Sequence, residues 1–328
     1  MTTLNSAKPV MCLWSIVASR HHCGDLPPQS DTLAGPLYCS GMRNTVLLTL
    51  LAMIAFAANS VLCRLALGAG HIDAASFASV RVISGALALA AIVFYRSDGR
   101  VERDANWRSA LALFAYMVFF SFAYLSLGAG TGALILFAAV QLTMFIVALR
   151  AGETFSALSW GGLILAIAGL VYLVSPGVTA PEPVGAILMT IAGIAWGVYS
   201  LLGRGVKDPT QATAWNFILS VPLVIITSAL FVQHFHATTT GVALAIGSGV
   251  VASGIGYVIW YTALRGLAAT SAATVQLSVP VIAAIGGVIL LAEDVTMRLV
   301  VASVATLGGV SIVLLQRKGR RASAAPTD

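Results

Sequence analysis

Long uninterrupted runs of apolar residues constrain this chain more than any other feature of its sequence. The last two runs, 270–291 and 297–315, lie on either side of the acidic pair Glu293 and Asp294. Each is close to the roughly 20 residues that an α-helix needs to cross the hydrocarbon core of a bilayer. The runs are continuous rather than alternating, which favours helices over strands. The end of the chain is therefore predicted to be a helix, a very short acidic turn and a second helix.

Composition places these helices in lipid. Of the 328 residues, 59% are hydrophobic and 9% are charged, whereas an ordinary soluble domain carries about 25% charged residues. Backbone polar groups find no water inside a bilayer, so a chain crosses it only as helices or as a closed barrel. The net charge of +6 comes from basic residues scattered through short loops and the C-terminal tail, which is typical of membrane topology and not of nucleic-acid binding. The sequence predicts an all-α integral membrane protein whose partner is the lipid bilayer.

The apolar runs predict ten transmembrane helices. Two stretches, 109–149 and 242–291, are about twice a membrane thickness and must turn back, at Gly128–Gly132 and at Arg265–Gly266. The predicted spans are 44–67, 75–95, 108–127, 131–149, 158–175, 184–203, 212–232, 241–264, 270–291 and 297–315.

The basic residues predict the orientation. An even number of spans puts both termini on one side, and most basic residues lie on that side. They are Arg43, Arg96, Arg100, Arg103, Arg108, Arg150, Arg204, Lys207, Arg265, Arg317, Lys318, Arg320 and Arg321. By the positive-inside rule both termini are cytoplasmic.

One spacing of 140 residues recurs along the chain and indicates an internal duplication. It relates Glu153 to Glu293, Ala133 to Ala273, Val140 to Pro280, Gly169 to Gly309, Phe56-Ala57 to Trp196-Gly197 and Arg64 to Arg204. Each copy holds five spans, an odd number, so the second copy enters the membrane upside down relative to the first. The predicted fold is two inverted five-helix repeats, at 44–175 and 184–315.

The two ends of the chain lie outside the repeats. Residues 1–43 are polar and contain prolines, and we expect a disordered extension. Met42, followed at once by the first apolar run, is an alternative translation start that N-terminal sequencing of the native protein would identify. Residues 316–328 form a predicted basic cytoplasmic tail.

This pattern resembles the EamA-type proteins of the drug/metabolite transporter superfamily. The resemblance is carried by Gly152-Glu153, Ala292-Glu293, Pro280, Trp196-Gly197 and Arg81, and it extends over residues 44–315. It implies a secondary transporter in the bacterial plasma (inner) membrane that moves a small metabolite, such as an amino acid or a nucleobase, usually outward. The substrate, the direction, the coupling ion and the oligomeric state, including a homodimer, stay open.

Polar side chains inside the spans are the first candidates for a substrate site. A polar group deep in a span faces the bundle interior or a wet cavity, because exposure to lipid is costly. The candidates are Asn59, Gln141 and Gln276, the last two from equivalent spans of the two repeats. The alternative for each is a hydrogen bond between helices, which is common for Asn and Gln in membrane bundles.

Aromatic residues form the second class of candidates. Tyr116, Trp196, Tyr199 and Trp260 are positioned to give an apolar wall with polar tips for a ligand. The alternative is that those near a span end are interface anchors.

Arg81 is the only basic residue well inside a span. It is a candidate for attracting an anionic substrate group, although its side chain is expected to reach the outer interface instead. Glu153 and Glu293 lie at span ends, where we expect each to cap the next helix.

Two other classes of function remain as alternatives. A membrane enzyme acting on lipids usually needs clustered Asp, Glu or His, and the acidic residues here are single or at loop ends. No Cys-x-x-Cys spacing occurs, so the sequence predicts neither a metal site nor a cofactor. A non-transporting scaffold would not require a duplicated inverted unit. The prediction is therefore a transporter rather than an enzyme, with its site near the midplane between the repeats.

Overall fold

A computed structural model describes residues 34–96, 106–203, 206–264, 266–267 and 269–323. Within these ranges the chain is helical and contains no strand, apart from an isolated antiparallel bridge between Ile72 and Ala237. The principal elements are α2 (Ala34–Gly68), α3 (Ala74–Arg96), α4 (Trp107–Ala123), α5 (Ala129–Arg150), α6 (Ala157–Val174), α7 (Pro183–Leu202), α8 (Pro209–Leu230), α9 (Thr239–Gly247), η3 (Ser248–Ile255), α10 (Gly256–Leu264), α11 (Ala269–Gln276), α12 (Ser278–Leu291) and α13 (Met297–Ser323).

Each predicted span corresponds to one helix or to two or three consecutive helical segments. Nine segments of the described chain are long and apolar enough to cross a membrane, and α4 adds a tenth apolar helix of 17 residues. The first predicted turn also exists, but it comes slightly earlier than expected, between the end of α4 at Ala123 and the start of α5 at Ala129. The fold is an all-α membrane protein.

Two spans are interrupted. The eighth contains the π-helix η3 between α9 and α10, and the ninth breaks at Leu277 between α11 and α12. Pro280 has no N–H with which to continue the helical ladder across this break. A kink in the ninth span is thus explained by its proline, whereas Pro222 lies inside an unbroken α8.

The chain ends differ in part from expectation. Helix α2 begins at Ala34, so residues 34–43 of the predicted disordered extension are helical. Pro36 falls in the first turn, where a missing N–H costs no hydrogen bond. Residues 1–33, and with them most of the predicted extension, lie outside the described ranges. Helix α13 continues through the predicted tail as far as Ser323.

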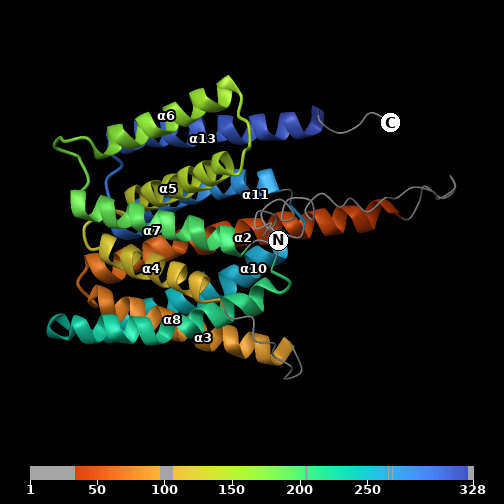
Figure 1. Cartoon of the computed structure of the whole chain (residues 1–328). Helices are drawn as coiled ribbons and strands as arrows, with labels where there is room; N and C mark the ends of the chain where they lie inside the picture. Colours follow the sequence, from red (N-terminus) through yellow and green to blue (C-terminus); the bar gives the residue numbers. More distant parts are fainter. Residues whose placement is uncertain (1–33, 97–105, 204–205, 265, 268, 324–328) are drawn as a thin grey trace, which may run out of the picture.

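The two halves interleave. Helix α7, the first of the second half, packs against α4 and α5 of the first half. Correspondingly, α2 packs against α12 and against the segment formed by η3 and α10. Equivalent helices also pair with each other, α6 with α13 along one side of the bundle and α3 with α8 along the other (Figure 1). Each contact therefore has a counterpart when the halves are exchanged, as expected for two copies of one unit.

The bundle has two ends that differ in which helices finish there. The end at which α3 and α7 finish and α4 and α8 begin is called the terminal end, and the end at which α2, α4 and α12 finish is called the opposite end.

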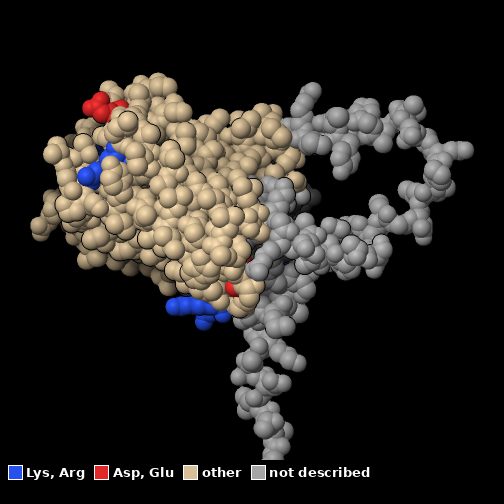
Figure 2. Space-filling model, turned by 90° about the horizontal axis from the view of Figure 1, so that it is seen from above, with Lys and Arg blue, Asp and Glu red and all other residues tan. Residues whose placement is uncertain are grey.

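Figure 2 shows one side of the molecule as a broad uncharged surface with charged side chains only near its margins. Leu165, Val171 and Val304 on α6 and α13 are among the exposed apolar residues. Such a surface matches a hydrocarbon environment.

Candidate functional site

Arg81 lies inside the fold rather than at its surface. Its side chain is 0% exposed. Nη2 donates a hydrogen bond to the Tyr116 hydroxyl at 3.1 Å, and both Nη2 and Nε lie 3.3 Å from Ser253 Oγ. The guanidinium carbon stands 5.3 and 4.9 Å from the ring centroids of Tyr116 and Phe120. The expectation that Arg81 reaches the outer interface is wrong, because α4 and η3 enclose it.

The π-helix η3 and a glycine bring Ser253 to this arginine. A Cβ atom on Gly249 would overlap the Arg81 carbonyl oxygen and Ser84 Oγ, so glycine allows η3 to approach α3. π-Helical turns occur frequently at functional sites. Ser253 Oγ also accepts a hydrogen bond from Asn59 Nδ2 at 3.4 Å. Asn59, Arg81 and Tyr116 of the first half thus meet Ser253 of the second.

The Arg81 guanidinium has more donors than nearby acceptors. It carries five N–H groups, and Ser253 Oγ, with two lone pairs, is within reach of three donors if Asn59 is included. Nη1 has no hydrogen-bond partner among the described residues. Burying a charge costs several kcal/mol, and two ring contacts return up to about 2 kcal/mol each. The unpaired Nη1 still costs about 1–3 kcal/mol or more, so the site favours an added acceptor.

Aromatic rings from both halves surround this group. The Trp196 ring lies 4.8 Å from Tyr116, 5.4 Å from Tyr257, 5.5 Å from Tyr199 and 6.5 Å from Phe56, measured between centroids. These five rings come from α2, α4, α7 and α10, the helices that interleave. Together with Arg81 and Ser253 they form what we call the central site.

Three residues of the central site were not predicted as candidates. Phe56 and Trp196 occupy equivalent positions in the duplication, so the repeat itself was a signal for Phe56. Tyr257 is 2% exposed and its hydroxyl has no partner among the described residues. Its ring contacts those of Phe56, Trp196 and Phe217. Ser253 carried no signal, because its role depends on the π-helix.

The other predicted residues lie farther out or are not hydrogen-bonded to the Arg81 group. Trp260 is buried, and its ring centroid is 5.8 Å from that of Phe56, at the edge of the central site. Gln141 is 8% exposed in α5, and its Nε2 has no partner in the described chain. Gln276 is partly buried at the end of α11, beside the break. The structure does not join the two glutamines to the Arg81 group through hydrogen bonds.

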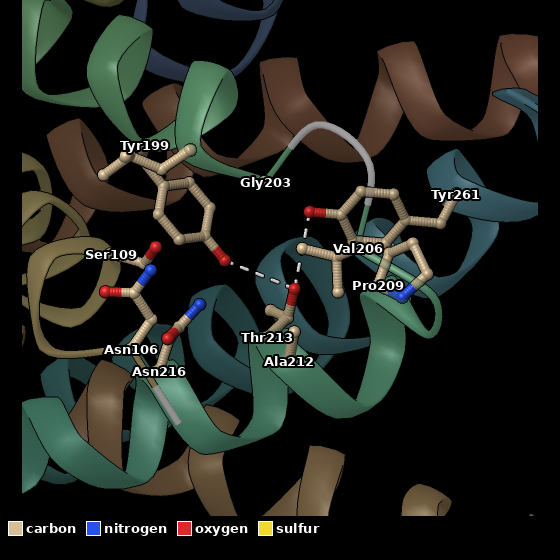
Figure 3. A pocket seen from close by; sticks show the side chains of 11 residues that line it. Asn106, Ser109, Tyr199, Gly203, Val206, Pro209, Ala212, Thr213, Asn216 and Tyr261 are labelled. Atoms are coloured by element: carbon tan, nitrogen blue, oxygen red, sulfur yellow. Dashed lines mark hydrogen bonds between the residues drawn. The ribbon is translucent and has the colours of Figure 1, made fainter. Parts of the chain in front are cut away.

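A small cavity lies at the terminal end of the bundle (Figure 3). It measures about 50 Å³ and is lined by the ends of α4, α7 and α8, with Tyr261 from α10. Tyr199 and Tyr261 point their hydroxyls toward Thr213, at 3.2 and 3.4 Å (Figure 3). Because Tyr199 lines the cavity and also contacts Trp196 within the central site, the cavity adjoins the central site at this ring.

The opposite end is held by an ion pair between the halves. Arg64 Nε of α2 lies 3.1 Å from Glu293 Oε1, just after α12. Glu293 Oε2 accepts a hydrogen bond from the backbone N–H of Ala129 at 2.8 Å. Glu293 therefore caps α5 and not the next helix, α13, whose first turn is capped by Thr296 instead. In the described ranges no group of three His, Cys, Asp or Glu side chains could hold a metal ion.

Comparison with known proteins agrees with this architecture. An uncharacterized protein of Pseudomonas aeruginosa is 47% identical over 85% of this chain and 98% of its own length. An uncharacterized transporter of Archaeoglobus fulgidus is 26% identical over 81% of this chain and 96% of its own. A protein known from a crystal structure shares the fold, with a TM-score of 0.58 and 20% identity, covering 81% of this chain and 98% of that one.

The family match divides the chain as the duplication does. The model of the EamA-like transporter family matches twice, at residues 43–175 and 183–315. These two segments hold the five helices α2–α6 and the five spans from α7 to α13. The chain belongs to the EamA-like transporter family, within the drug/metabolite transporter superfamily, and is a multi-pass membrane transporter.

Proposed function

We propose that this transporter exports a small metabolite by alternating access, with the substrate bound at the central site between the two repeats. The observation that carries the proposal is the make-up of this site. Both halves contribute rings to it, and the first helices of the two halves meet there through Phe56 of α2 and Trp196 of α7, whose ring centroids are 6.5 Å apart. Sliding or rocking of one half against the other would therefore change the site directly.

The contacts at the two ends of the bundle indicate which end is closed in this conformation. The Arg64–Glu293 ion pair joins the halves at the opposite end, and the cavity near Tyr199 lies toward the terminal end. We infer a state that is closed at the opposite end and nearer to opening at the terminal end. A substrate would then enter past Tyr199 and Trp196.

The orientation in the membrane is part of the proposal. Basic residues such as Arg96, Arg108, Arg150 and Lys207 lie at the terminal end, so this end is cytoplasmic by the positive-inside rule. The membrane would be the bacterial plasma membrane. Reporter fusions at Lys207 and at Glu182 should report opposite sides, with Lys207 inside; the same side for both would refute the topology.

Secretion by intact cells tests transport even though the substrate is unidentified. Metabolites in the medium and in the cytoplasm are compared between cells that produce the protein, cells that lack it, and cells with Trp196→Leu. We expect at least one small metabolite to move outward with the wild type and about tenfold less with Trp196→Leu, since this ring packs against rings of both halves.

A matched tryptophan provides the control. Trp107 is 55% exposed at the start of α4, and Trp107→Leu should export normally. Purified wild type must then exchange the same metabolite across liposomes. If the purified protein exchanges none of the metabolites found in the secretion comparison, that result contradicts transport. Chemical conversion of a lipid by the purified protein would favour the enzyme alternative.

A further inference from the structure

We propose that the central site recognises the carboxylate of a small organic anion, and that Arg81 binds this group. The inference deepens the transport function proposed above by naming the class of substrate. It starts from Arg81, a cation with 0% exposure whose Nη1 has no hydrogen-bond partner in the described chain. The one ion pair found among the described residues, between Arg64 and Glu293, is elsewhere.

The chemistry of the free donors selects a carboxylate. An arginine side chain presents its N–H groups as a planar fork that matches the two oxygens of a carboxylate. Nε and Nη2 already face Ser253 and Tyr116, so Nη1 is the nitrogen that remains to donate to a carboxylate oxygen. An arginine stays protonated at any accessible pH, and the ligand must therefore bring the negative charge.

A second unpartnered donor belongs to the same site. The Tyr257 hydroxyl makes no hydrogen bond with the described residues, although the side chain is 2% exposed. The ring centroid of Tyr257 lies 5.4 Å from that of Trp196 and 5.8 Å from that of Phe56, within the central site. Two buried donors without acceptors in one cluster favour a ligand that brings acceptor atoms, as an anion does.

Acidic side chains are missing from the centre of the described chain. Its six acidic residues lie in loops or at helix ends, namely Asp73, Glu153, Glu182, Asp208, Glu293 and Asp294. An ammonium group at the central site would therefore have no carboxylate partner and would stand near the Arg81 charge, which repels it. This arrangement favours a monocarboxylate over a zwitterion or an amine.

The rings define the rest of the ligand. Tyr116 and Phe120 offer ring faces to the guanidinium. Trp196 and Phe56 continue this wall away from it, and such walls suit an apolar or planar body. The rings contact one another here, so they must part when a ligand enters. Trp196 is the ring between the Tyr199 cavity and Arg81, which makes it the first to move.

Three probes that share a phenyl ring and differ in their charged groups test the assignment. Binding of 3-phenylpropionate, phenylalanine and 2-phenylethylamine to the purified full chain is measured by titration calorimetry. We expect 3-phenylpropionate to bind at least about tenfold more tightly than 2-phenylethylamine, with phenylalanine in between. Equal binding of the acid and the amine, tighter binding of the amine, or no binding of any probe would overturn the carboxylate assignment.

Paired variants locate the recognition. Arg81→Gln should weaken 3-phenylpropionate binding by at least about tenfold, while Arg108→Gln, which removes an exposed arginine, should not. Tyr257→Phe removes a hydroxyl with no partner in the described chain, so a purely structural role predicts no loss of binding. We expect about fivefold weaker binding for Tyr257→Phe and none for Tyr172→Phe, whose ring is 45% exposed.

These measurements remain informative if Arg81→Gln does not fold, because Tyr257→Phe leaves the charge in place. Unchanged binding in Tyr257→Phe together with unchanged binding in Arg81→Lys would overturn the site.

Counterflow in liposomes separates the proposal of transport from the proposal of carboxylate recognition. Binding of 3-phenylpropionate without counterflow would contradict transport while supporting the carboxylate site, and counterflow of 2-phenylethylamine alone would do the reverse.

Discussion

Arg64 and Glu293 connect the two halves of the transporter at the opposite end of the bundle, with 3.1 Å between Nε and Oε1. Arg64 Nη1 also donates to the carbonyl oxygens of Tyr124 and Leu125, each at 3.2 Å. Glu293 accepts from the N–H of Ala129. The pair therefore joins the ends of α2, α4 and α12 to the start of α5.

Glu293→Gln should loosen this end. The two side chains are 25% and 22% exposed, so the ion pair is worth about 1 kcal/mol or less. That corresponds to up to about a fivefold shift toward opening at this end. Cys63 is buried in α2 and serves as the reporter. The measurement uses a chain with Cys12, Cys23 and Cys39 changed to serine. In this background Cys63 should react faster with a small maleimide when Glu293→Gln is present than when Glu293 is kept.

Asp294→Asn is the control for this measurement, because Asp294 is exposed beside Glu293 and makes no ion pair in the described chain. It should leave the Cys63 reaction rate unchanged. Equal rates in Glu293→Gln and the wild type would mean that the ion pair does not hold this end closed.

The turns after the fourth helix of each half predict opposite effects of two small substitutions. Gly152 and Ala292 are equivalent positions, and both have positive φ, +82° and +52°. Glycine adopts this conformation freely, whereas alanine is strained by about 1 kcal/mol. Gly152→Ala should lower the free energy of unfolding by about that amount and Ala292→Gly should raise it. Thermal unfolding in detergent checks both, and a shift of the same sign for the two would be the contradictory outcome.

Adjacent glycines in α13 predict a contrast in stability. A Cβ on Gly309 would overlap the backbone of α6, and one on Gly162 of α6 would stand 2.6 Å from the Gly309 carbonyl oxygen. Gly309→Ala should therefore destabilise the pairing of α6 and α13 by about 1–3 kcal/mol. A Cβ on Gly308 would meet no atom within 4 Å, so Gly308→Ala should be neutral or slightly stabilising. Similar melting temperatures for the two variants would contradict close packing at Gly309.

Glu182 predicts a dependence of stability on pH. Its carboxylate accepts hydrogen bonds from the N–H groups of Gly185 and Val184 at the start of α7, and these lower its pKa from the usual 4.5. A lowered folded pKa means that this contribution is complete above 4.5 and is lost as the pH falls through the folded value. Glu182→Gln should remove this part of the acid destabilisation. Melting curves recorded from neutral pH to about pH 3 test it, and parallel losses in variant and wild type would refute it.

Much of the fold could be predicted because apolar length and the 140-residue repeat are local or periodic signals. They predicted the ten spans and the turn between α4 and α5. The interleaving of α2 and α7 was not predictable, since contact between halves depends on the shapes of both surfaces. The start of α2 at Ala34 also lay beyond the apolar pattern.

The site was harder to predict for a related reason. Trp196, Tyr116 and Asn59 were found from polarity and ring type within spans, and they do lie beside Arg81 or its partners. The burial of Arg81 depends on Ser253, which reaches it through a π-helix that no sequence period revealed. Gln141 and Gln276 come from equivalent spans of the two repeats, yet nothing in the described hydrogen bonds joins them to the central site.

Alternating access itself is tested most directly by distances between spin-label pairs at the two ends, measured in lipid. One pair replaces Leu125 and Val295 at the opposite end, and the other replaces Trp107 and Lys207 at the terminal end. Alternating access predicts two populations, one with the opposite end closed and the terminal end open and one with the reverse, so that the two distances change in opposite senses when Glu293→Gln is introduced. A single population at both ends, or two distances that lengthen together, would contradict it.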